Sequence, residues 1–195
     1  MEPQALVFDF DGTLVDSMPM HFRCWQRALE PFGLTFDHET FQNWGGVPTR
    51  EIVSRLSEAQ GIAVDLEVVV HAKETLTRAH AHEAEPIEPV LSIARTSRGV
   101  LPMAIATGGP RALIGPRMEA LGIHDWFGAI VTADDVARGK PEPDPFLLAA
   151  KLLGVEPTRC RAYEDAPSGL ASARAAGMEV IDVASLIGPN VAPQT

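Results

Sequence analysis

Cysteine is scarce in this sequence, which contains only Cys24 and Cys160 among its 195 residues. Their spacing matches neither a zinc site nor a redox motif. One possible pair is also sparser than the disulfide framework of a small secreted domain. We therefore expect a reducing, cytoplasmic environment for the protein.

Basic residues are in the minority, because 16 Lys and Arg stand against 26 Asp and Glu, which gives a formal net charge of −10. Binding to a nucleic-acid backbone requires a basic face. We therefore expect no nucleic-acid partner. A monomer is the working expectation, although the sequence carries no direct signal for the oligomeric state.

Long hydrophobic runs are also missing, since no apolar stretch approaches the roughly 20 residues of a membrane span. The first apolar stretch reaches Asp9 too early to serve as a signal peptide. We therefore expect no membrane partner, and the first residues are expected to belong to the fold.

The sequence does contain several short apolar runs that are typical of buried strands. They lie at residues 5–8, 103–107, 129–133, 160–163 and 179–183. Helical patterns separate the last four runs, beginning near proline and closing on glycine. This alternation predicts an α/β fold, a Rossmann-like doubly wound parallel sheet.

One long segment breaks the alternation of strands and helices. Residues 18–83 contain several helical patterns and no convincing strand. The segment is predicted to be an inserted, all-helical cap, with hinges near residues 17–20 and 84–89. Residues 1–17 and 84–195 would then form the catalytic core.

Acidic residues follow two of the predicted strands. Asp9 and Asp11 come after the first strand, and Glu164 and Asp165 come after the fourth. Ligands of an open α/β sheet sit outside the carboxyl ends of its strands. Carboxylates that converge there repel one another unless a cation lies among them. All-oxygen ligands without a nearby histidine favour Mg²⁺ over zinc.

Anion-binding groups follow the other strands. Thr107 offers a hydroxyl, Gly108 and Gly109 offer backbone amides at a helix start, and Lys140 offers a positive charge. Taken alone, Thr107 could be a helix cap, Lys140 a solvated loop charge and Asp9 a turn residue. Together the groups predict phosphoryl transfer, in which the protein positions groups and offsets charge.

Four short motifs carry a family resemblance: "DFDGT" at Asp9, "TG" at Thr107, "KP" at Lys140 and "ED" at Glu164. In order, spacing and position they resemble the motifs of the haloacid dehalogenase superfamily, and the match spans nearly the whole chain. The helical insertion after the first motif resembles the cap of the branch that contains β-phosphoglucomutase and small sugar-phosphate phosphatases.

The resemblance implies a role for each motif residue. Asp9 would be the nucleophile that forms an aspartyl-phosphate, and Asp11 would be the general acid and base. Thr107 and Lys140 would bind the transferring phosphoryl group.

The resemblance also implies a metal site. Asp9, the backbone carbonyl of Asp11 and Asp165 would hold Mg²⁺, with Glu164 as a direct or supporting ligand. The expected substrate is a small phosphorylated sugar.

Cap residues supply further candidates for substrate binding. His21 resembles a histidine found at this place in β-phosphoglucomutases, although it could also be an exposed polar residue of a helix. Gly46 and Arg50 lie in "WGGVPTRE", which resembles the substrate-recognition loop of the branch. Lys73 is a weaker candidate, and an ordinary surface charge is an equal alternative.

Two departures favour a hydrolase over a mutase. Mutases of this type usually carry a lysine where this chain has Gly45, and Pro48 and Thr49 precede the arginine. Mutases also usually continue into another strand and helix, whereas this chain reaches only Val183 before a loose tail. Both features resemble phosphatases of fructose 1-phosphate and similar sugars.

Two alternatives remain open at this point. A phosphohexomutase would share every catalytic residue and pass the phosphoryl group to a second sugar hydroxyl instead of water. A non-enzymatic, receiver-like phospho-acceptor would also pair an aspartate, an acidic cluster, a threonine and a lysine. Asp11 and the cap weigh against the acceptor, which needs neither a leaving-group acid nor a lid.

Overall fold

The computed structural model describes residues 2–45 and 47–187 of the chain. A five-stranded sheet forms its centre, with strand order β5-β4-β1-β6-β7 and parallel pairing throughout. The strands are β1 (Ala5–Phe8), β4 (Met103–Ala106), β5 (Ala129–Val131), β6 (Cys160–Glu164) and β7 (Glu179–Asp182). The predicted α/β class with a Rossmann-like parallel sheet is confirmed.

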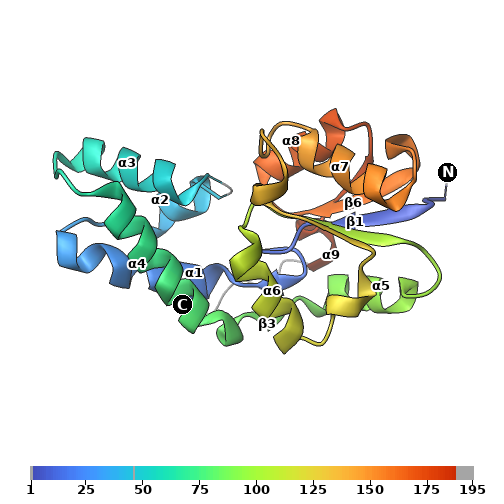
Figure 1. Cartoon of the computed structure of the whole chain (residues 1–195), viewed down its shortest axis with the longest axis horizontal. Coiled ribbons are helices and arrows are strands. Elements are labelled where there is room, and N and C mark those ends of the chain that lie inside the picture. The colour runs from blue at the N-terminus through green and yellow to red at the C-terminus, as the bar shows by residue number, and fades with distance from the viewer. Residues whose placement is uncertain (1, 46, 188–195) are drawn as a thin grey trace.

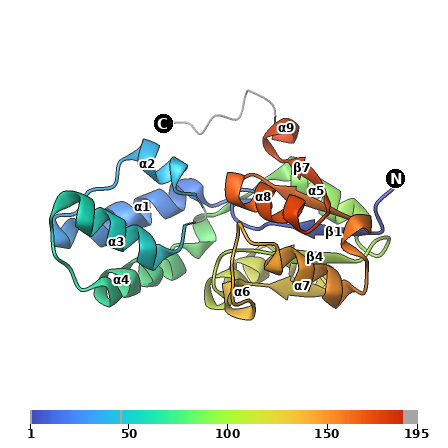
Figure 2. The same ribbon diagram turned by 90° about the horizontal axis from the view of Figure 1, so that it is seen from above.

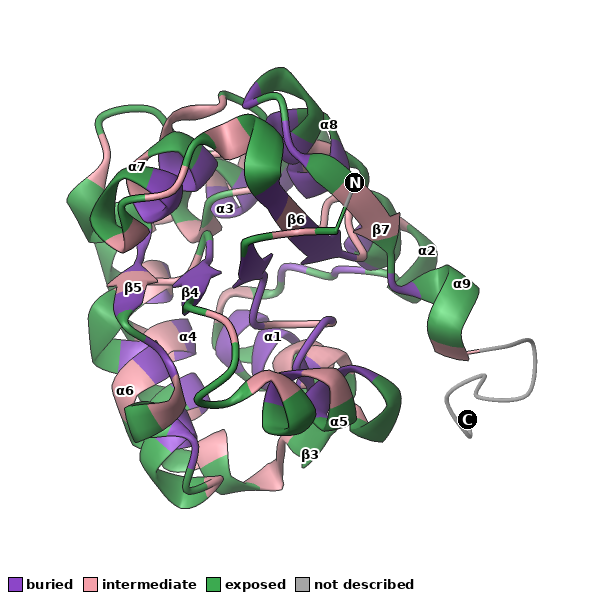
Figure 3. Cartoon of the chain, turned by 90° about the vertical axis from the view of Figure 1, so that its right-hand side faces the viewer, coloured by how far each residue is buried: buried purple, intermediate pink, exposed green. Residues whose placement is uncertain are grey.

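Helices cover both faces of this sheet (Figures 1 and 2). One face packs against α5 (Glu88–Ser97) and α6 (Arg111–Ala120), and the other against α7 (Asp144–Leu153) and α8 (Pro167–Ala175). Figure 3 shows buried strands between layers of helices whose outer surfaces are exposed. The short helix α9 (Ala184–Ile187) follows the last strand.

The central strands are apolar because both of their faces are covered. Every residue of β1 and β4 is buried, whereas the edge strand β7 is buried at none of its positions. The rings of Phe8 and Tyr163 stack with centroids 4.9 Å apart on neighbouring strands. This pattern of continuous apolar runs is expected for a parallel sheet with helices on both sides.

Residues 18–83 form a group of helices beside the sheet (Figures 1 and 2). Its helices are α1 (Met18–Leu29), α2 (His38–Asn43), α3 (Thr49–Gln60) and α4 (Leu66–Ala79). They enclose their own apolar core, which includes Trp25, Phe36, Val53 and Val69. That this group acts as a separate cap domain stays a prediction.

Single 3₁₀ turns connect several of these elements. They are η1 (Glu30–Phe32), η2 (Ala81–Glu83), η3 (His124–Trp126), η4 (Ala133–Asp135) and η5 (Pro157–Arg159). Glycine ends two of the longer helices, because Gly61 after α3 and Gly154 after α7 adopt φ values of 67° and 69°. Such left-handed conformations cost glycine little, which explains the glycine stops predicted from the sequence.

A two-stranded ribbon joins the two segments that connect residues 18–83 to the sheet. β2 (Val15–Asp16) pairs antiparallel with β3 (Glu85–Pro86), with Val15 opposite Pro86 and Asp16 opposite Glu85. The sequence did not indicate these strands, because two residues carry no periodic signal. The chain therefore leaves the sheet domain and returns to it at adjacent points.

Within residues 2–45 and 47–187, no helix combines the length and the apolar character that crossing a bilayer requires.

Candidate active site

Three carboxylates meet where β1 and β6 end. The two strands are neighbours, with Phe8 in register with Tyr163, so the residues that follow them emerge at the same edge of the sheet. Asp9, Glu164 and Asp165 each offer an oxygen atom, and these atoms lie within 4.8 Å of one another. Asp9 is 6% exposed and Glu164 only 1%. The edge of the sheet therefore holds a concentrated and largely buried negative charge.

Burial and mutual repulsion work against ionisation in this cluster. Burial raises the pKa of Asp9 well above its ordinary value, with further increases from Glu164 and Asp165 that oppose the effect of Lys140. Burial, together with Glu164, raises the pKa of Asp165 to about 7. Both carboxyls would ionise more readily if a cation lay between them.

Lys140 supplies one positive charge to the cluster. Its Nζ donates to Asp9 Oδ1 at 2.6 Å and to Glu164 Oε1 at 2.5 Å. Burial lowers the pKa of Lys140, but the two carboxylates outweigh it and raise that pKa above its ordinary range. One lysine cannot balance three ionised carboxylates, so the charge of the cluster favours a further cation.

The cluster has the chemistry of a divalent metal site. Its donors are all carboxylate oxygens, which suit hard cations such as Mg²⁺. Thr13 Oγ1 donates to Asp165 Oδ1 at 2.8 Å, and the amide of Ala166 donates to Glu164 Oε2 at 2.8 Å. These contacts hold the carboxylates of Asp165 and Glu164 in place. With oxygen donors held in this way, the residues present fit a metal ion.

Anion-binding groups lie beside the acidic cluster. Thr107 follows β4, is 3% exposed, and accepts a hydrogen bond from the amide of Gly109 at 3.1 Å. A cavity of about 390 Å³ brings Thr107, Gly108 and Gly109 together with Asp9 and Lys140. The predicted core residues therefore face one space.

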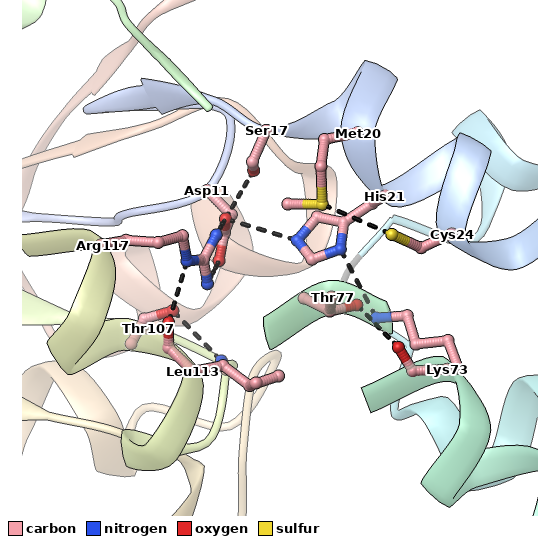
Figure 4. A network of polar contacts seen from close by, with 11 residues as sticks. Asp11, Ser17, Met20, His21, Cys24, Lys73, Thr77, Thr107, Leu113 and Arg117 are labelled. Carbon is pink, nitrogen blue, oxygen red and sulfur yellow. Dashed lines mark hydrogen bonds and ion pairs between the residues drawn. The ribbon is translucent and has the colours of Figure 1, made fainter. Parts of the chain in front are cut away.

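Asp11 faces the same cavity but holds different partners (Figure 4). Ser17 Oγ donates to its Oδ1 at 2.5 Å, and the guanidinium of Arg117 contacts both of its oxygens. Burial raises the pKa of Asp11, but Arg117 and His21 outweigh it and hold that pKa far below its usual range. The carboxylate of Asp11 is not part of the three-carboxylate cluster, so its predicted metal contact would have to use its backbone carbonyl.

His21 and Lys73 extend this network onto α1 and α4 (Figure 4). His21 Nε2 lies 3.5 Å from Asp11 Oδ1, and His21 Nδ1 lies 3.5 Å from Lys73 Nζ. Lys73 is 6% exposed, and burial lowers its pKa to about 8. Both residues line the cavity. The alternative interpretation of Lys73 as an ordinary surface charge is therefore wrong.

Arg50, the candidate from the predicted recognition loop, does not face the cavity as His21 and Lys73 do. Arg50 lies in the first turn of α3, its side chain is 60% exposed, and it pairs with Glu67. Pro48 and Thr49 line the cavity, whereas the described lining residues do not include Arg50. Gly46 lies outside the described residues.

Comparison with known proteins places the chain in a family. Residues 3–177 match the model of the haloacid dehalogenase-like hydrolases. This chain belongs to that family. It is therefore an enzyme of the hydrolase class, as the four motifs predicted, and the family assignment weighs against a passive phospho-acceptor.

Individual relatives support the same assignment. The chain is 35% identical over 179 residues to fructose-1-phosphate phosphatase YqaB of Escherichia coli, covering 92% of this chain and 95% of that protein. It is 31% identical over 182 residues to a phosphorylated carbohydrates phosphatase of Thermotoga maritima, covering 91% and 83%.

A solved relative confirms the fold. The structure of CbbY from Rhodobacter sphaeroides in complex with phosphate superposes with a TM-score of 0.83 at 26% identity, covering 92% of this chain and 85% of that one. The fold is therefore shared with a protein whose structure was solved in complex with phosphate.

Three residues that hold the site carboxylates were not predicted from the sequence. Thr13 and Ser17 bind Asp165 and Asp11 through hydroxyl groups, and Arg117 binds Asp11 from α6. Arg117 did leave a signal in the sequence. It falls on the buried stripe of α6, with Leu113, Ile114 and Met118, where an apolar residue is expected.

Gly169 leaves the space that the carboxylate of Glu164 occupies, so a larger residue at position 169 would displace that carboxylate. A Cβ atom at Gly169 would overlap the carboxylate of Glu164. Glu164 cannot move away without loosening its bonds to Lys140 and Ala166. We expect Gly169→Ala to lower kcat/KM for the substrate by about tenfold or more, because such displacements impair catalytic geometry.

The matched control for this prediction is Gly115→Ala in α6, where a Cβ atom meets nothing within 4 Å. Steady-state kinetics of the two variants would check the prediction. Equal activity in both would show that Glu164 tolerates displacement.

Proposed function

We propose that this hydrolase is a Mg²⁺-dependent phosphatase that hydrolyses a small sugar phosphate through an aspartyl-phosphate on Asp9. The observation that carries the proposal is the convergence of Asp9, Asp165, Lys140 and Thr107 on one cavity. Names of relatives add the substrate class, since they include phosphatases of fructose 1-phosphate and of phosphorylated carbohydrates.

In the first half of the reaction, a carboxylate oxygen of Asp9 attacks phosphorus, and the bond between phosphorus and the sugar oxygen breaks. Asp11 first takes up a proton from solvent, which requires its contact with Arg117 to loosen because that contact favours the ionised carboxylate. It then gives this proton to the departing sugar oxygen. Lys140 and Thr107 hold the phosphoryl oxygens, and Lys140 exchanges part of its contact with Asp9 for them. Asp9, Asp165 and the backbone carbonyl of Asp11, with support from Glu164, would hold the metal ion, which would offset the charge of the transferring group.

In the second half, Asp11 takes a proton from a water molecule that attacks the aspartyl-phosphate. The bond between phosphorus and Asp9 then breaks, which releases inorganic phosphate and restores the carboxylate of Asp9. A single carboxyl group can serve as acid and then base, because the first step leaves it deprotonated.

The cap supplies the sugar contacts in this proposal. Lys73 and His21 reach the cavity from α4 and α1, and the aromatic side chains of Trp25 and Trp44 also line it. Lys73 Nζ lies 5.4 Å from the centre of the Trp25 ring. A sugar ring has hydroxyl groups for the lysine and apolar C–H faces for the aromatic rings. Gly46 and Arg50 remain proposed contacts of the recognition loop.

Phosphate release from a panel of sugar phosphates tests the proposed function. The panel includes fructose 1-phosphate and β-glucose 1-phosphate, each with Mg²⁺ and with EDTA. We expect release from one or two members, only in the presence of Mg²⁺. Conversion of glucose 1-phosphate to glucose 6-phosphate with little free phosphate would instead identify a mutase.

A further inference from the structure

The cavity has two ends that differ in their chemistry. At the sheet edge, Asp9, Thr107 and Lys140 provide the place for the transferring phosphoryl group. The rest of a substrate would extend toward α1 and α4, whose residues also line the cavity. Their charges therefore decide what the substrate can carry at a distance from its phosphoryl group.

The charges at this second end cancel. Arg117 and Asp11 form an ion pair, so neither contributes a net charge (Figure 4). Burial lowers the pKa of His21 below its ordinary value, so this side chain is neutral at neutral pH. Lys73 and Glu74 remain, one of each sign, and both come from α4. Among the lining residues that the structure describes, the end left for the sugar thus has no net formal charge.

Glu74 presents a carboxylate that the other contacts of the site do not use. It is partly buried, and no ion pair of 4.0 Å or less involves it within residues 2–45 and 47–187. Lys73 Nζ likewise contacts His21 and the Trp25 ring, and no carboxylate. An ammonium group donates hydrogen bonds, whereas a carboxylate only accepts them. Neighbouring hydroxyl groups of a sugar can satisfy both requirements.

We propose that Glu74 restricts the enzyme to sugars that carry a single phosphoryl group. The inference rests on the proposed function, which puts the transferring phosphoryl group at Asp9. A second phosphoryl group would bring a charge of about −2 to the end where Lys73 and Glu74 already cancel. An unmatched like charge is a common means of rejecting a wrong ligand. A sugar hydroxyl is uncharged and can donate to the carboxylate.

The same charge has a bearing on the choice between hydrolase and mutase. A phosphohexomutase must bind a sugar bisphosphate, because the phosphoryl group passes to a second hydroxyl of the sugar. Glu74 would weaken the binding of that bisphosphate. The residue therefore favours transfer of the phosphoryl group to water.

The test is Glu74→Gln, which removes the charge and keeps the shape and one acceptor oxygen. Its kcat/KM is measured with the best sugar monophosphate and with the bisphosphate of the same sugar, at equal free Mg²⁺. We expect the ratio of bisphosphate to monophosphate kcat/KM to rise about tenfold, through a lower KM for the bisphosphate, since a close like charge is removed. The ratio is the readout because a structural defect would lower both values together.

The matched control is Glu58→Gln on α3. Glu58 is exposed, accepts a hydrogen bond from Ser54 at 3.1 Å, and is not among the described lining residues. This variant makes the same change in net charge away from the cavity and should leave the ratio unaltered. An unchanged ratio in Glu74→Gln, or an equal rise in both variants, would overturn the proposal.

A binding experiment separates this proposal from the proposed function. Calorimetric titration of Asp9→Asn, with and without Glu74→Gln, measures the affinity for both sugars without turnover. We expect tighter binding of the bisphosphate in the double variant, and equal affinities would overturn the role of Glu74. Phosphate release by the wild type with an unchanged ratio would overturn that role alone. Absence of release, with a binding preference that depends on Glu74, would overturn the proposed hydrolysis and support the restriction.

Discussion

Asp9→Asn is expected to reduce phosphate release from the preferred sugar phosphate by about a thousandfold or more, since removing a nucleophile disables the catalytic unit as a whole. An amide in this position cannot attack phosphorus as the carboxylate does. The amide also weakens the metal cluster and the ion pair with Lys140. The measurement is a steady-state phosphate assay with Mg²⁺, together with thermal melting of the variant.

A matched control for this change is Asp125→Asn. Asp125 carries an exposed ion pair with Arg98, with 68% of its side chain accessible. Exposed pairs contribute little, so the control variant should keep its activity. Substantial turnover by Asp9→Asn would show that another group attacks phosphorus and that the proposed mechanism is wrong.

Asp165→Asn is expected to have the second largest effect, a loss of activity that added Mg²⁺ restores only in part. The change removes one of three carboxylates that would hold the metal. We expect a reduction of kcat/KM of about a hundredfold at moderate Mg²⁺, in the range observed when the supports of a metal site are removed. Titration of activity with Mg²⁺ measures the change in apparent affinity.

The pH dependence of stability provides an independent readout of Asp165. Its pKa is about 7 in the folded protein, against an ordinary value of 3.8, because burial disfavours the charged form. The fold therefore binds a proton that the unfolded chain releases, and the stability of the metal-free protein should fall as the pH rises from about 4 to about 7. In Asp165→Asn this contribution disappears.

Melting temperatures measured in EDTA across this pH range test whether the stability falls as the pH rises. The wild type should lose more stability than Asp165→Asn between the two ends of the range. A steeper loss in the variant would mean that the carboxyl is ionised more readily in the fold than its surroundings indicate. Above pH 7 the ionised carboxylate should favour the metal-bound state.

The strands and their acidic ends could be predicted because each depends on local sequence. Buried parallel strands read as continuous apolar runs, and the carboxyl ends of such strands share one edge of the sheet. Asp9 and Glu164 therefore come together from positions far apart in the chain. The same logic led to Thr107 and Lys140, which the structure also places at this edge.

Arg117 and Lys73 show where this logic stops. Both side chains are buried although charged residues are usually exposed. Helical periodicity places Arg117 on the buried stripe of α6, but it does not indicate that Asp11 is its partner. The burial of Lys73 depends on the packing of α4 on α1, which no local pattern encodes. Arg50 stays a predicted ligand on the strength of its motif, and in this structure its side chain pairs with Glu67 on the surface.

The ribbon formed by Val15–Asp16 and Glu85–Pro86 has a consequence for how such a protein can diversify. The insertion begins and ends at paired residues, and it contributes no strand to the central sheet. Neighbouring strands lie only about 5 Å apart, so the two attachment points are as close as the ends of a hairpin. A change in the length of residues 18–83 would therefore leave the register of β1 and β6, which aligns the carboxylates, undisturbed.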